Sequence, residues 1–474
     1  MESSKQDTPG ESRRFHLAVW RWHFYAGICV LPLTIILAVS GLAMLAGAPL
    51  DRYLRSDLFT VIPRGAPLSA TEQAAAVAAA YPDWNLRTLR VAPSAAASSQ
   101  FDIAPKHASA NHGGHGDPDV VMVFVDPYTG AVLGEHAVDA TVHAWAKNVH
   151  GTLLLGRAGD YIIEVAAGLG VLLIVTGLYL WWPRQGSTLR SALLPDLAAP
   201  GRRRWRDLHG AVAAWSAPLL LFFFVSGLAW TPFWGGELVQ AWSSLPGEQF
   251  TAPLADETHG SLDHGVHREV PWAIERTRLP AASPEQGTRD ICADGVMGID
   301  EVIAYARANG FERFRAHWPR GERGVWTVAS TTIAGDTQEL DGDRIVHLDP
   351  ATGCVLAEIG FADYSPMGQF MAAGIPLHQA DTGIVNLALN VLFCLAVIGM
   401  GIAALAACWA RRPAGAMTLV PPPLPRDARV WRGAVLVMLA ASLAFPLSAA
   451  TIAAVLAIDL LLLPRLRALG ALFE

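Results

Sequence analysis

The chain has 474 residues, of which 52% are hydrophobic and only 16% are charged, and its mean hydropathy is positive. This balance is typical of a membrane protein and argues against an ordinary soluble chain. The net charge of −7 is spread along the sequence, so the composition does not indicate nucleic-acid binding.

One apolar stretch occurs twice. The first copy contains His23, Pro32 and Ser40-Gly41-Leu42, and these align without gaps with His209, Pro218 and Ser226-Gly227-Leu228. An Asp-Pro-x-Thr-Gly segment also recurs, at 126–130 and 349–353, and a histidine precedes a long apolar run at His150 and at His378. The matches indicate an internal duplication. Each half is predicted to contain an apolar helix with histidine at its start, a soluble domain, and a second such helix.

Apolar runs of about 20 residues are long enough to cross a bilayer. The last apolar region is too long for one crossing and carries Pro446 in its middle, which predicts a helical hairpin. The predicted segments are an N-terminus (1–19), crossings at 20–47, 158–182, 208–234 and 382–410, outer domains at 48–157 and 235–381, inner loops at 183–207 and 411–429, the hairpin (430–464) and a tail (465–474).

Arginine and lysine gather in the two ends and in the two inner loops. Positively charged short segments stay in the cytoplasm, so six crossings place both ends inside and both domains in the periplasm of a bacterial inner membrane. With five crossings the tail would break this rule. A cleaved signal peptide is an alternative for the first helix, since Ala46-Gly47-Ala48 resembles a cleavage site. Its apolar run is longer than a usual signal, and its pattern recurs inside the chain.

Each outer segment is predicted to be a small α+β unit. Ser69 and Glu72 have the spacing of a capping box at the start of a helix that ends near Pro82. Alternating runs predict strands at 86–91, 101–104, 120–125 and 131–136. The second unit repeats this order, with a helix at 298–309 and strands near 313–318, 323–331 and 343–348.

Several short motifs carry a family resemblance. They are Trp22-His23 with Ala26-Gly27, His150-Gly151-Thr152-Leu153-Leu154-Leu155-Gly156, the run from Thr176 to Arg184, Asp207-Leu208-His209, Val270-Pro271-Trp272-Ala273-Ile274-Glu275, and Phe445-Pro446-Leu447. With them the chain resembles, over nearly its whole length, the PepSY-associated transmembrane proteins. This family is often called iron-regulated membrane proteins and includes inner-membrane ferric-siderophore reductases. The resemblance implies paired PepSY domains and histidine-ligated b-type haems.

The histidines support haem binding independently. An ionisable group within a membrane helix is a functional hypothesis by default, and neutral imidazole is an axial ligand of haem iron. His23 and His209 are expected at the cytoplasmic helix ends, and His150 and His378 at the outer ends. One histidine from each half can hold one haem, which predicts two haem b groups. His143, seven residues before His150, is the alternative outer ligand. The chain has no C-x-x-C-H motif for covalent haem.

For the other polar residues, and for the four histidines themselves, two interpretations remain open. The four histidines would otherwise be interfacial anchors, and Glu164 is either a proton carrier or an interfacial carboxylate. Two outer loops rich in histidine could bind a metal ion, although a solvated insert is the favoured reading. Their histidines are His107, His112, His115, His259, His264 and His267. Cys292 and Cys354 share one outer domain, where a disulfide is permitted.

The sequence shows no Rossmann fingerprint and no P-loop, so electrons would come from membrane quinol or a cytoplasmic reductase. The leading hypothesis is therefore a di-haem oxidoreductase that passes electrons across the bilayer to a periplasmic ferric siderophore or other ferric chelate. The alternative is a haem-free membrane protein that binds metal or acts as a scaffold for metal uptake.

Overall fold

The computed structural model describes residues 9–106, 120–137, 141–184, 188–263, 269–282, 296–412 and 444–457. The chain divides into two compact units. We call Met1–Leu42, Asn148–Val239 and Asn390–Glu474 the helical unit, and Ala43–Lys147 and Gln240–Leu389 the sheet unit.

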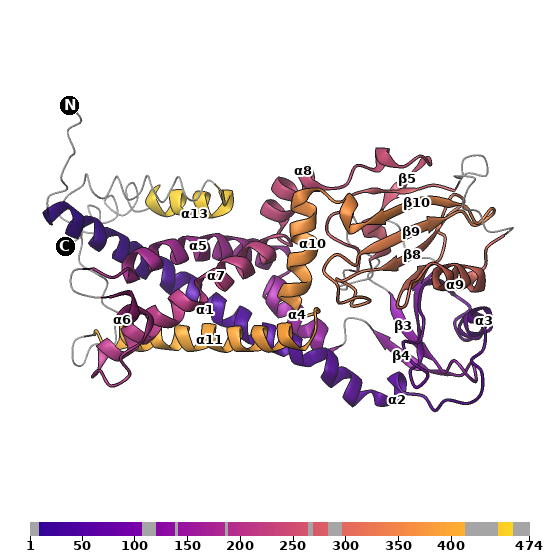
Figure 1. The fold of residues 1–474 in the computed structure, drawn as a ribbon, viewed down its shortest axis with the longest axis horizontal. Coiled ribbons are helices and arrows are strands. Elements are labelled where there is room, and N and C mark those ends of the chain that lie inside the picture. Colours follow the sequence, from indigo (N-terminus) through magenta and orange to yellow (C-terminus); the bar gives the residue numbers. More distant parts are fainter. Residues whose placement is uncertain are drawn as a thin grey trace, which may run out of the picture. The chain divides into compact units, whose positions relative to one another are not determined.

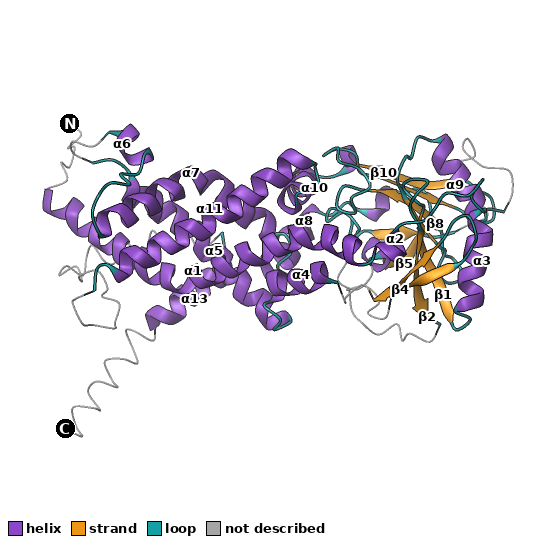
Figure 2. Ribbon diagram, turned by 90° about the horizontal axis from the view of Figure 1, so that it is seen from below, coloured by secondary structure: helices purple, strands orange, loops and turns teal. Residues whose placement is uncertain are grey.

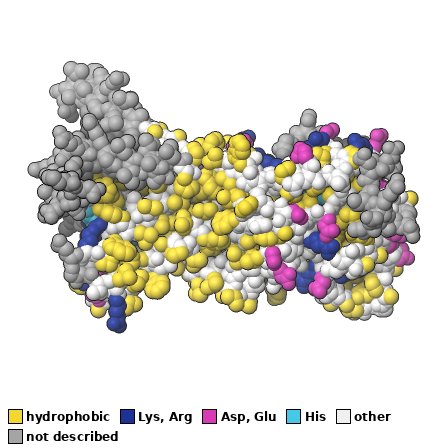
Figure 3. Space-filling model, turned by 45° about the horizontal axis from the view of Figure 1, so that its top comes forward, with side chains coloured by type: hydrophobic (Ala, Val, Ile, Leu, Met, Phe, Trp, Pro, Cys, Tyr) yellow, Lys and Arg dark blue, Asp and Glu magenta, His cyan; other side chains and the backbone are white. Residues whose placement is uncertain are grey.

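Among the described residues, four helices are long and apolar enough to cross a membrane, which agrees with four of the predicted crossings (Figures 1 and 2). They are α1 (Pro9–Leu54), α5 (Arg157–Trp181), α7 (Arg202–Leu228) and α11 (Ile384–Trp409). Figure 3 shows hydrophobic side chains spread over the described surface of these helices. Such a surface suits lipid, in which each helix satisfies its own backbone hydrogen bonds.

The predicted C-terminal hairpin lies mostly outside the described residues, which include only its helix α13 (Pro446–Ala457). Ser448 of α13 donates a hydrogen bond to the carbonyl of Val165 on α5, at 3.1 Å. A Cβ at Gly168 would collide with the Ser448 hydroxyl, so glycine is needed where these two helices meet. The six-crossing topology remains a prediction.

The two copies of the repeated helix end differently. Helix α1 continues without a break to Leu54, whereas α7 ends at Leu228 and is followed by a π-helix, η2 (Pro232–Gln240). Pro232 explains the break, because proline has no N–H to continue the α-helical hydrogen bonds. The short helices α6 (Leu189–Leu193) and α8 (Ala241–Ser243) precede α7 and follow η2, respectively.

The expectation that His150 and His378 begin the second apolar helix of each half is wrong. His150 lies on a separate helix, α4 (Val142–Thr152), and His378 lies on α10 (Pro366–Gln379). The chain between α4 and α5 turns through Leu153 and Leu154, whose φ angles are 51° and 60°, and Ala380 after α10 has a φ of 67°. Left-handed residues cannot continue a right-handed helix, so each short helix ends before its crossing begins.

The sheet unit contains one eight-stranded antiparallel sheet in the order β10-β9-β8-β7-β1-β2-β3-β4. Its strands are β1 (Trp84–Arg90), β2 (Ser99–Pro105), β3 (Val121–Val125), β4 (Val132–Ala137), β7 (Arg315–His317), β8 (Trp326–Ser330), β9 (Arg344–Leu348) and β10 (Val355–Gly360). The sequence predicted two separate small sheets. The structure joins them where β1 pairs with β7, with Leu89 opposite Ala316.

The duplication is visible in the hydrogen bonds of both halves of this sheet. Helix α3 (Ala70–Ala80) starts at the predicted capping box of Ser69 and Glu72, and α9 (Ile299–Ala308) is its counterpart. The residue before each N-cap donates its N–H to the proline of the Asp-Pro-x-Thr-Gly turn, from Leu68 to Pro127 at 2.7 Å and from Met297 to Pro350 at 2.8 Å. Equal contacts at equal places confirm the internal repeat in this region.

Both faces of the sheet are covered. Helices α3 and α9 pack over a shared core that includes Phe101, Val302 and Val328. On the half made by β7 to β10, a second core contains Ile274, Ile345 and Tyr364. Its cover comes from α10, from the small hairpin of β5 (Leu254–Thr258) and β6 (Arg278–Pro280), and from the chain around Ile274. Helix α2 (Ser56–Phe59) lies beside β3 and β4.

A buried group of charges lies where the two halves of the sheet meet. Arg90 of β1 pairs with Asp102 at 2.7 Å and also with Glu269. The other oxygen of Glu269 is 3.2 Å from Arg315 of β7. One carboxylate therefore links an arginine from each half. A buried pair adds little net stability, but removing one member leaves the other charge unpaired.

We predict that Glu269→Ala destabilises the protein by about 3–5 kcal/mol, because two buried guanidinium groups lose their shared partner. Urea unfolding of the full chain in detergent micelles measures the effect. The matched control is Glu358→Ala, which removes an exposed pair with Arg344 at 2.8 Å and should cost below about 1 kcal/mol. Equal losses in the two variants would contradict a structural role for the buried group.

Candidate functional site

His23 of α1 has its protonation state fixed by its neighbour. Its Nδ1 lies 2.9 Å from Oγ1 of Thr176 on α5. The Thr176 hydroxyl donates its own proton to the carbonyl of Leu172, at 2.8 Å. The threonine oxygen can then only accept from His23, so the proton of the neutral imidazole is on Nδ1. Nε2 keeps its lone pair.

His209 of α7 has the same tautomer. Its Nδ1 is 3.1 Å from the carbonyl oxygen of Met400 on α11, and a carbonyl oxygen can only accept. Among the described residues, none makes a hydrogen bond to Nε2 of either histidine. His209 is close enough to His23 for the two rings to interact electrostatically. The structure thus brings the predicted cytoplasmic pair together.

His150 of α4 packs against the repeated Ser-Gly segment of α1. Its Nδ1 is 3.0 Å from the carbonyl of Leu37 and 3.1 Å from Oγ of Ser40, which itself donates to the carbonyl of Ile36 at 2.7 Å. A Cβ at Gly41 would lie 3.7 Å from the imidazole ring. Nδ1 is therefore the donor again, and the small residues of the repeated segment allow the ring to reach the helix.

The other outer histidines belong to the sheet unit. His378 lies in the last turn of α10, so its predicted pairing with His150 of the helical unit stays a prediction. His143 lies on α4, and its Nδ1 is 3.2 Å from the carbonyl of Met44. A Cβ at Gly47 would come within 2.8 Å of the His143 backbone, so α4 packs tightly against α1 there.

Glu164 of α5 holds the broken end of the second repeat. It is 3% exposed, and its two carboxylate oxygens accept the N–H groups of Phe233 and Trp234, each at 3.0 Å. These N–H groups are in the first turn of η2, where a helix has unsatisfied donors and favours negative charge. The contacts favour a structural carboxylate over a proton carrier.

His259 does not lie in a solvated loop. It is fully buried, its Nδ1 donates to the carbonyl of Thr277 at 2.8 Å, and its Nε2 is 3.0 Å from Nε2 of His347. Sequence reasoning missed His347, which lies within β9 with no local sign of its partner. The other loop histidines, His107, His112, His115, His264 and His267, lie outside the described residues. Within the described ranges no group of three ligands could hold a metal ion.

The cysteines separate into two groups. Cys354 is disulfide-bonded, whereas Cys29, Cys394 and Cys408 are free. Cys292, the partner that the sequence suggested, lies outside the described residues. A disulfide in the sheet unit fits an oxidising compartment.

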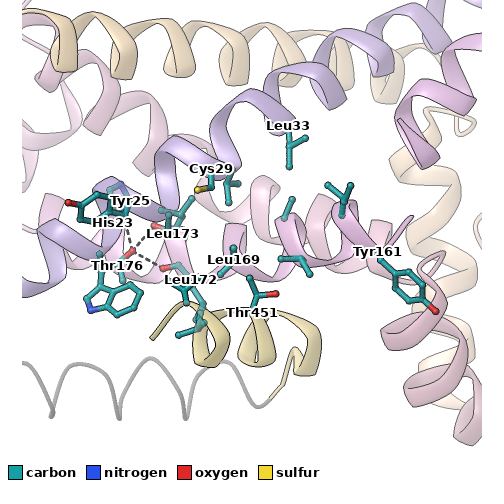
Figure 4. A pocket seen from close by; sticks show the side chains of 18 residues that line it. His23, Tyr25, Cys29, Leu33, Tyr161, Leu169, Leu172, Leu173, Thr176 and Thr451 are labelled. Carbon is teal, nitrogen blue, oxygen red and sulfur yellow. Dashed lines mark hydrogen bonds between the residues drawn. The ribbon is translucent and has the colours of Figure 1, made fainter. Parts of the chain in front are cut away.

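A groove that sequence reasoning missed runs along the helical unit between α1, α5 and α13 (Figure 4). Its volume is about 430 Å³, and most of its lining is apolar. His23 and Thr176 lie at one end and Tyr161 lies at the other. The groove depends on how α13 packs against α5, which no local sequence pattern reveals.

Comparison with known families gives one match. The family described as the PepSY-associated TM region matches residues 20–412, which is most of the chain. No curated protein matches the sequence.

The buried pair of His259 and His347 predicts acid sensitivity. Burial lowers the pKa of His259 to about 4, and it lowers the pKa of His347 as well. The unfolded chain binds protons below about pH 6.5 while the folded chain does not, so this stability is complete above pH 6.5 and is lost as pH falls toward 4. We expect a loss on the order of 3 kcal/mol from His259 alone.

The double variant His259→Leu, His347→Leu checks this assignment, because replacing both partners removes the titration without leaving one unpaired. Thermal unfolding between pH 7 and pH 4 should show a smaller loss of stability than in the parent protein. His136→Leu, which changes a partly exposed histidine whose pKa burial also lowers, is the control and should keep most of the parent's acid sensitivity. An unchanged profile in the double variant would assign the acid sensitivity to other groups.

Proposed function

The chain belongs to the PepSY-associated transmembrane family, and on this premise we propose that it is a di-haem b oxidoreductase of the bacterial inner membrane. It passes electrons to a ferric siderophore or another ferric chelate on the periplasmic side. His23 and His209 hold the cytoplasmic haem, and His150 and His378 hold the outer one.

The observation that carries the proposal is the shared tautomer of three histidines. His23 and His209 each donate Nδ1–H to an oxygen on a neighbouring helix, which leaves the Nε2 lone pair for a metal, and His150 donates its Nδ1–H in the same way. Metal-ligating histidines almost always use their second nitrogen in this way. If the three histidines were only interfacial anchors, nothing would require all of them to have the proton on Nδ1. His23 and His209, which are related by the repeat, share this tautomer.

The residues around these histidines suit a flat, apolar cofactor. A Cβ at Gly177 would lie 3.1 Å from the His23 ring, and the repeated Gly41 lies beside His150. The interior of the helical unit is apolar and contains Phe223 stacked on Phe393, with ring centroids 4.3 Å apart. These side chains exclude water from the interior. When bound, haem iron supplies one-electron redox chemistry.

Reduction of the acceptor explains how iron would be released. Siderophores bind Fe(III) through hard oxygen ligands, and Fe(II) is a softer ion that these ligands hold less tightly. Each electron delivered to the chelate converts one Fe(III) to Fe(II). The protein therefore needs only to deliver electrons on the side where the chelate arrives.

Substitution of the ligands tests the proposal. His23→Ala and His209→Ala should each lose the same single haem, and His150→Ala and His378→Ala should each lose the other, because every haem needs a ligand on both faces. Haem content per protein and the oxidised and dithionite-reduced absorption spectra provide the measurement. His16→Ala, one heptad before His23 on α1, is the control and should keep both haems.

Thr176→Val refines this test, because it removes the acceptor of the His23 Nδ1–H while keeping the ligand. We expect haem affinity at that site to fall about 10–100-fold, as for other contacts that orient metal ligands. If all four alanine variants retain two haems, the histidines are anchors and the proposal fails.

The proposed topology has its own test. The sheet unit is expected in the periplasm for two reasons. Its Cys354 is disulfide-bonded, and the arginine-rich segments expected in the cytoplasm, which are the two chain ends and the two inner loops, lie outside it. A phosphatase fused after Glu474, which is active only in the periplasm, should be inactive. An insertion after Lys106 is the matched fusion and should be active. An active fusion after Glu474 would replace six crossings by five.

A further inference from the structure

The groove beside His23 has the shape of a long, narrow molecule. It is lined by Ala26 and Val30 of α1, Ala166 and Leu169 of α5, and Thr451 and Ile452 of α13. On α5 its lining extends from Tyr161 to Thr176, which corresponds to about 22 Å at 1.5 Å per residue. The volume of the groove is about 430 Å³.

A groove of this length suits an extended apolar chain. It continues along α5 to Tyr161, away from the His23 end where the cytoplasmic haem is proposed. His209, the second predicted cytoplasmic ligand, is not among the lining residues. The groove would thus bind a second molecule beside His23, in addition to the haem.

Apart from Thr451, whose hydroxyl donates to a carbonyl of its own helix, the polar groups of the groove lie at its ends. His23 and Thr176 lie at the same end as Tyr25, whose hydroxyl accepts a hydrogen bond from Arg21 at 3.0 Å (Figure 4). The middle is formed by aliphatic side chains such as Val30 and Leu169. The groove therefore suits an amphipathic molecule with a polar head at His23 and a long apolar tail.

We propose that this groove binds an isoprenoid quinol, with its ring at the His23 end and its tail toward Tyr161, and that this quinol is the electron donor. The inference rests on the proposed function. The quinol loses two electrons and two protons and becomes the quinone. The two electrons reduce two ferric ions of the acceptor chelate to ferrous ions, and the two protons pass to water at the His23 end.

Two observations favour a quinol over an ordinary lipid. In the proposed pose the head group lies against His23, the proposed haem ligand. From that position a redox-active head can transfer electrons to the haem, whereas the head of an ordinary lipid cannot. The sequence also shows no nucleotide-binding fingerprint through which the chain itself could take electrons from a soluble donor. A donor dissolved in the bilayer reaches the groove directly from the lipid.

The test uses the full protein in detergent micelles and a photoactivatable azido-ubiquinone with a two-isoprene tail. Illumination should label peptides within 22–33, 161–176 or 451–455. Ala166→Phe and Leu169→Trp, which fill the groove, should weaken binding of the unmodified quinone at least about tenfold, equivalent to about 1.4 kcal/mol. Val175→Trp is the control, since Val175 is an exposed residue of α5 outside the groove and should bind as the parent does.

Binding is measured without reference to turnover, and the haem spectrum of each variant reports whether it is folded. If oleate displaces the quinone at equal concentration, or if labelling falls outside 22–33, 161–176 and the α13 lining at 451–455, the groove is a lipid site and the inference is overturned. A protein that shows both haems but binds no quinone overturns the inference alone. A protein that binds quinone but lacks haem overturns the proposed function instead.

Discussion

A hydrogen bond from histidine Nδ1 to an oxygen on a neighbouring helix is the interaction on which the helical unit depends. It joins α1 to α5 through His23, α7 to α11 through His209, and α4 to α1 through His150. In an apolar interior an imidazole N–H needs an acceptor, and a carbonyl or hydroxyl of the next helix provides one. The same bond selects the tautomer with its proton on Nδ1, which is the tautomer that the proposed haem ligation through Nε2 requires. One contact therefore serves both the packing and the proposed chemistry.

Much of this architecture could be predicted because it depends on residues that are close together in the sequence. The capping box of Ser69 and Glu72 and the paired Asp-Pro-x-Thr-Gly turns depend on residues a few positions apart, and both are found as expected. The four long apolar helices follow from length and hydropathy alone. The Ser40-Gly41 motif could be found in the sequence, but its contact with the His150 ring could not, because that ring comes from another helix.

The features that could not be predicted arise from contacts between distant residues. Pairing of β1 with β7 joins positions more than 200 residues apart, and the sequence of neither strand indicates which strand it pairs with. The sequence predicts His259 to lie in a histidine-rich loop, yet it is buried against His347 of β9. The short helices α4 and α10 lie in segments that the sequence assigned to the outer domains, and their ends depend on left-handed residues such as Ala380 that are not glycine.

The unequal ends of the two repeats show how one duplication acquires two roles. Helix α1 continues past its Ser-Gly segment and provides the oxygens of Leu37 and Met44 to histidines of α4. Helix α7 stops at Leu228, and the N–H groups freed near Pro232 are bound by Glu164. A buried carboxylate is costly unless it is hydrogen-bonded, so Glu164 is tied to the break that it stabilises. Helix α5 also packs against α13, and those two helices form the groove with α1. Helix α5 therefore provides both the carboxylate that binds the end of the second repeat and one wall of the groove.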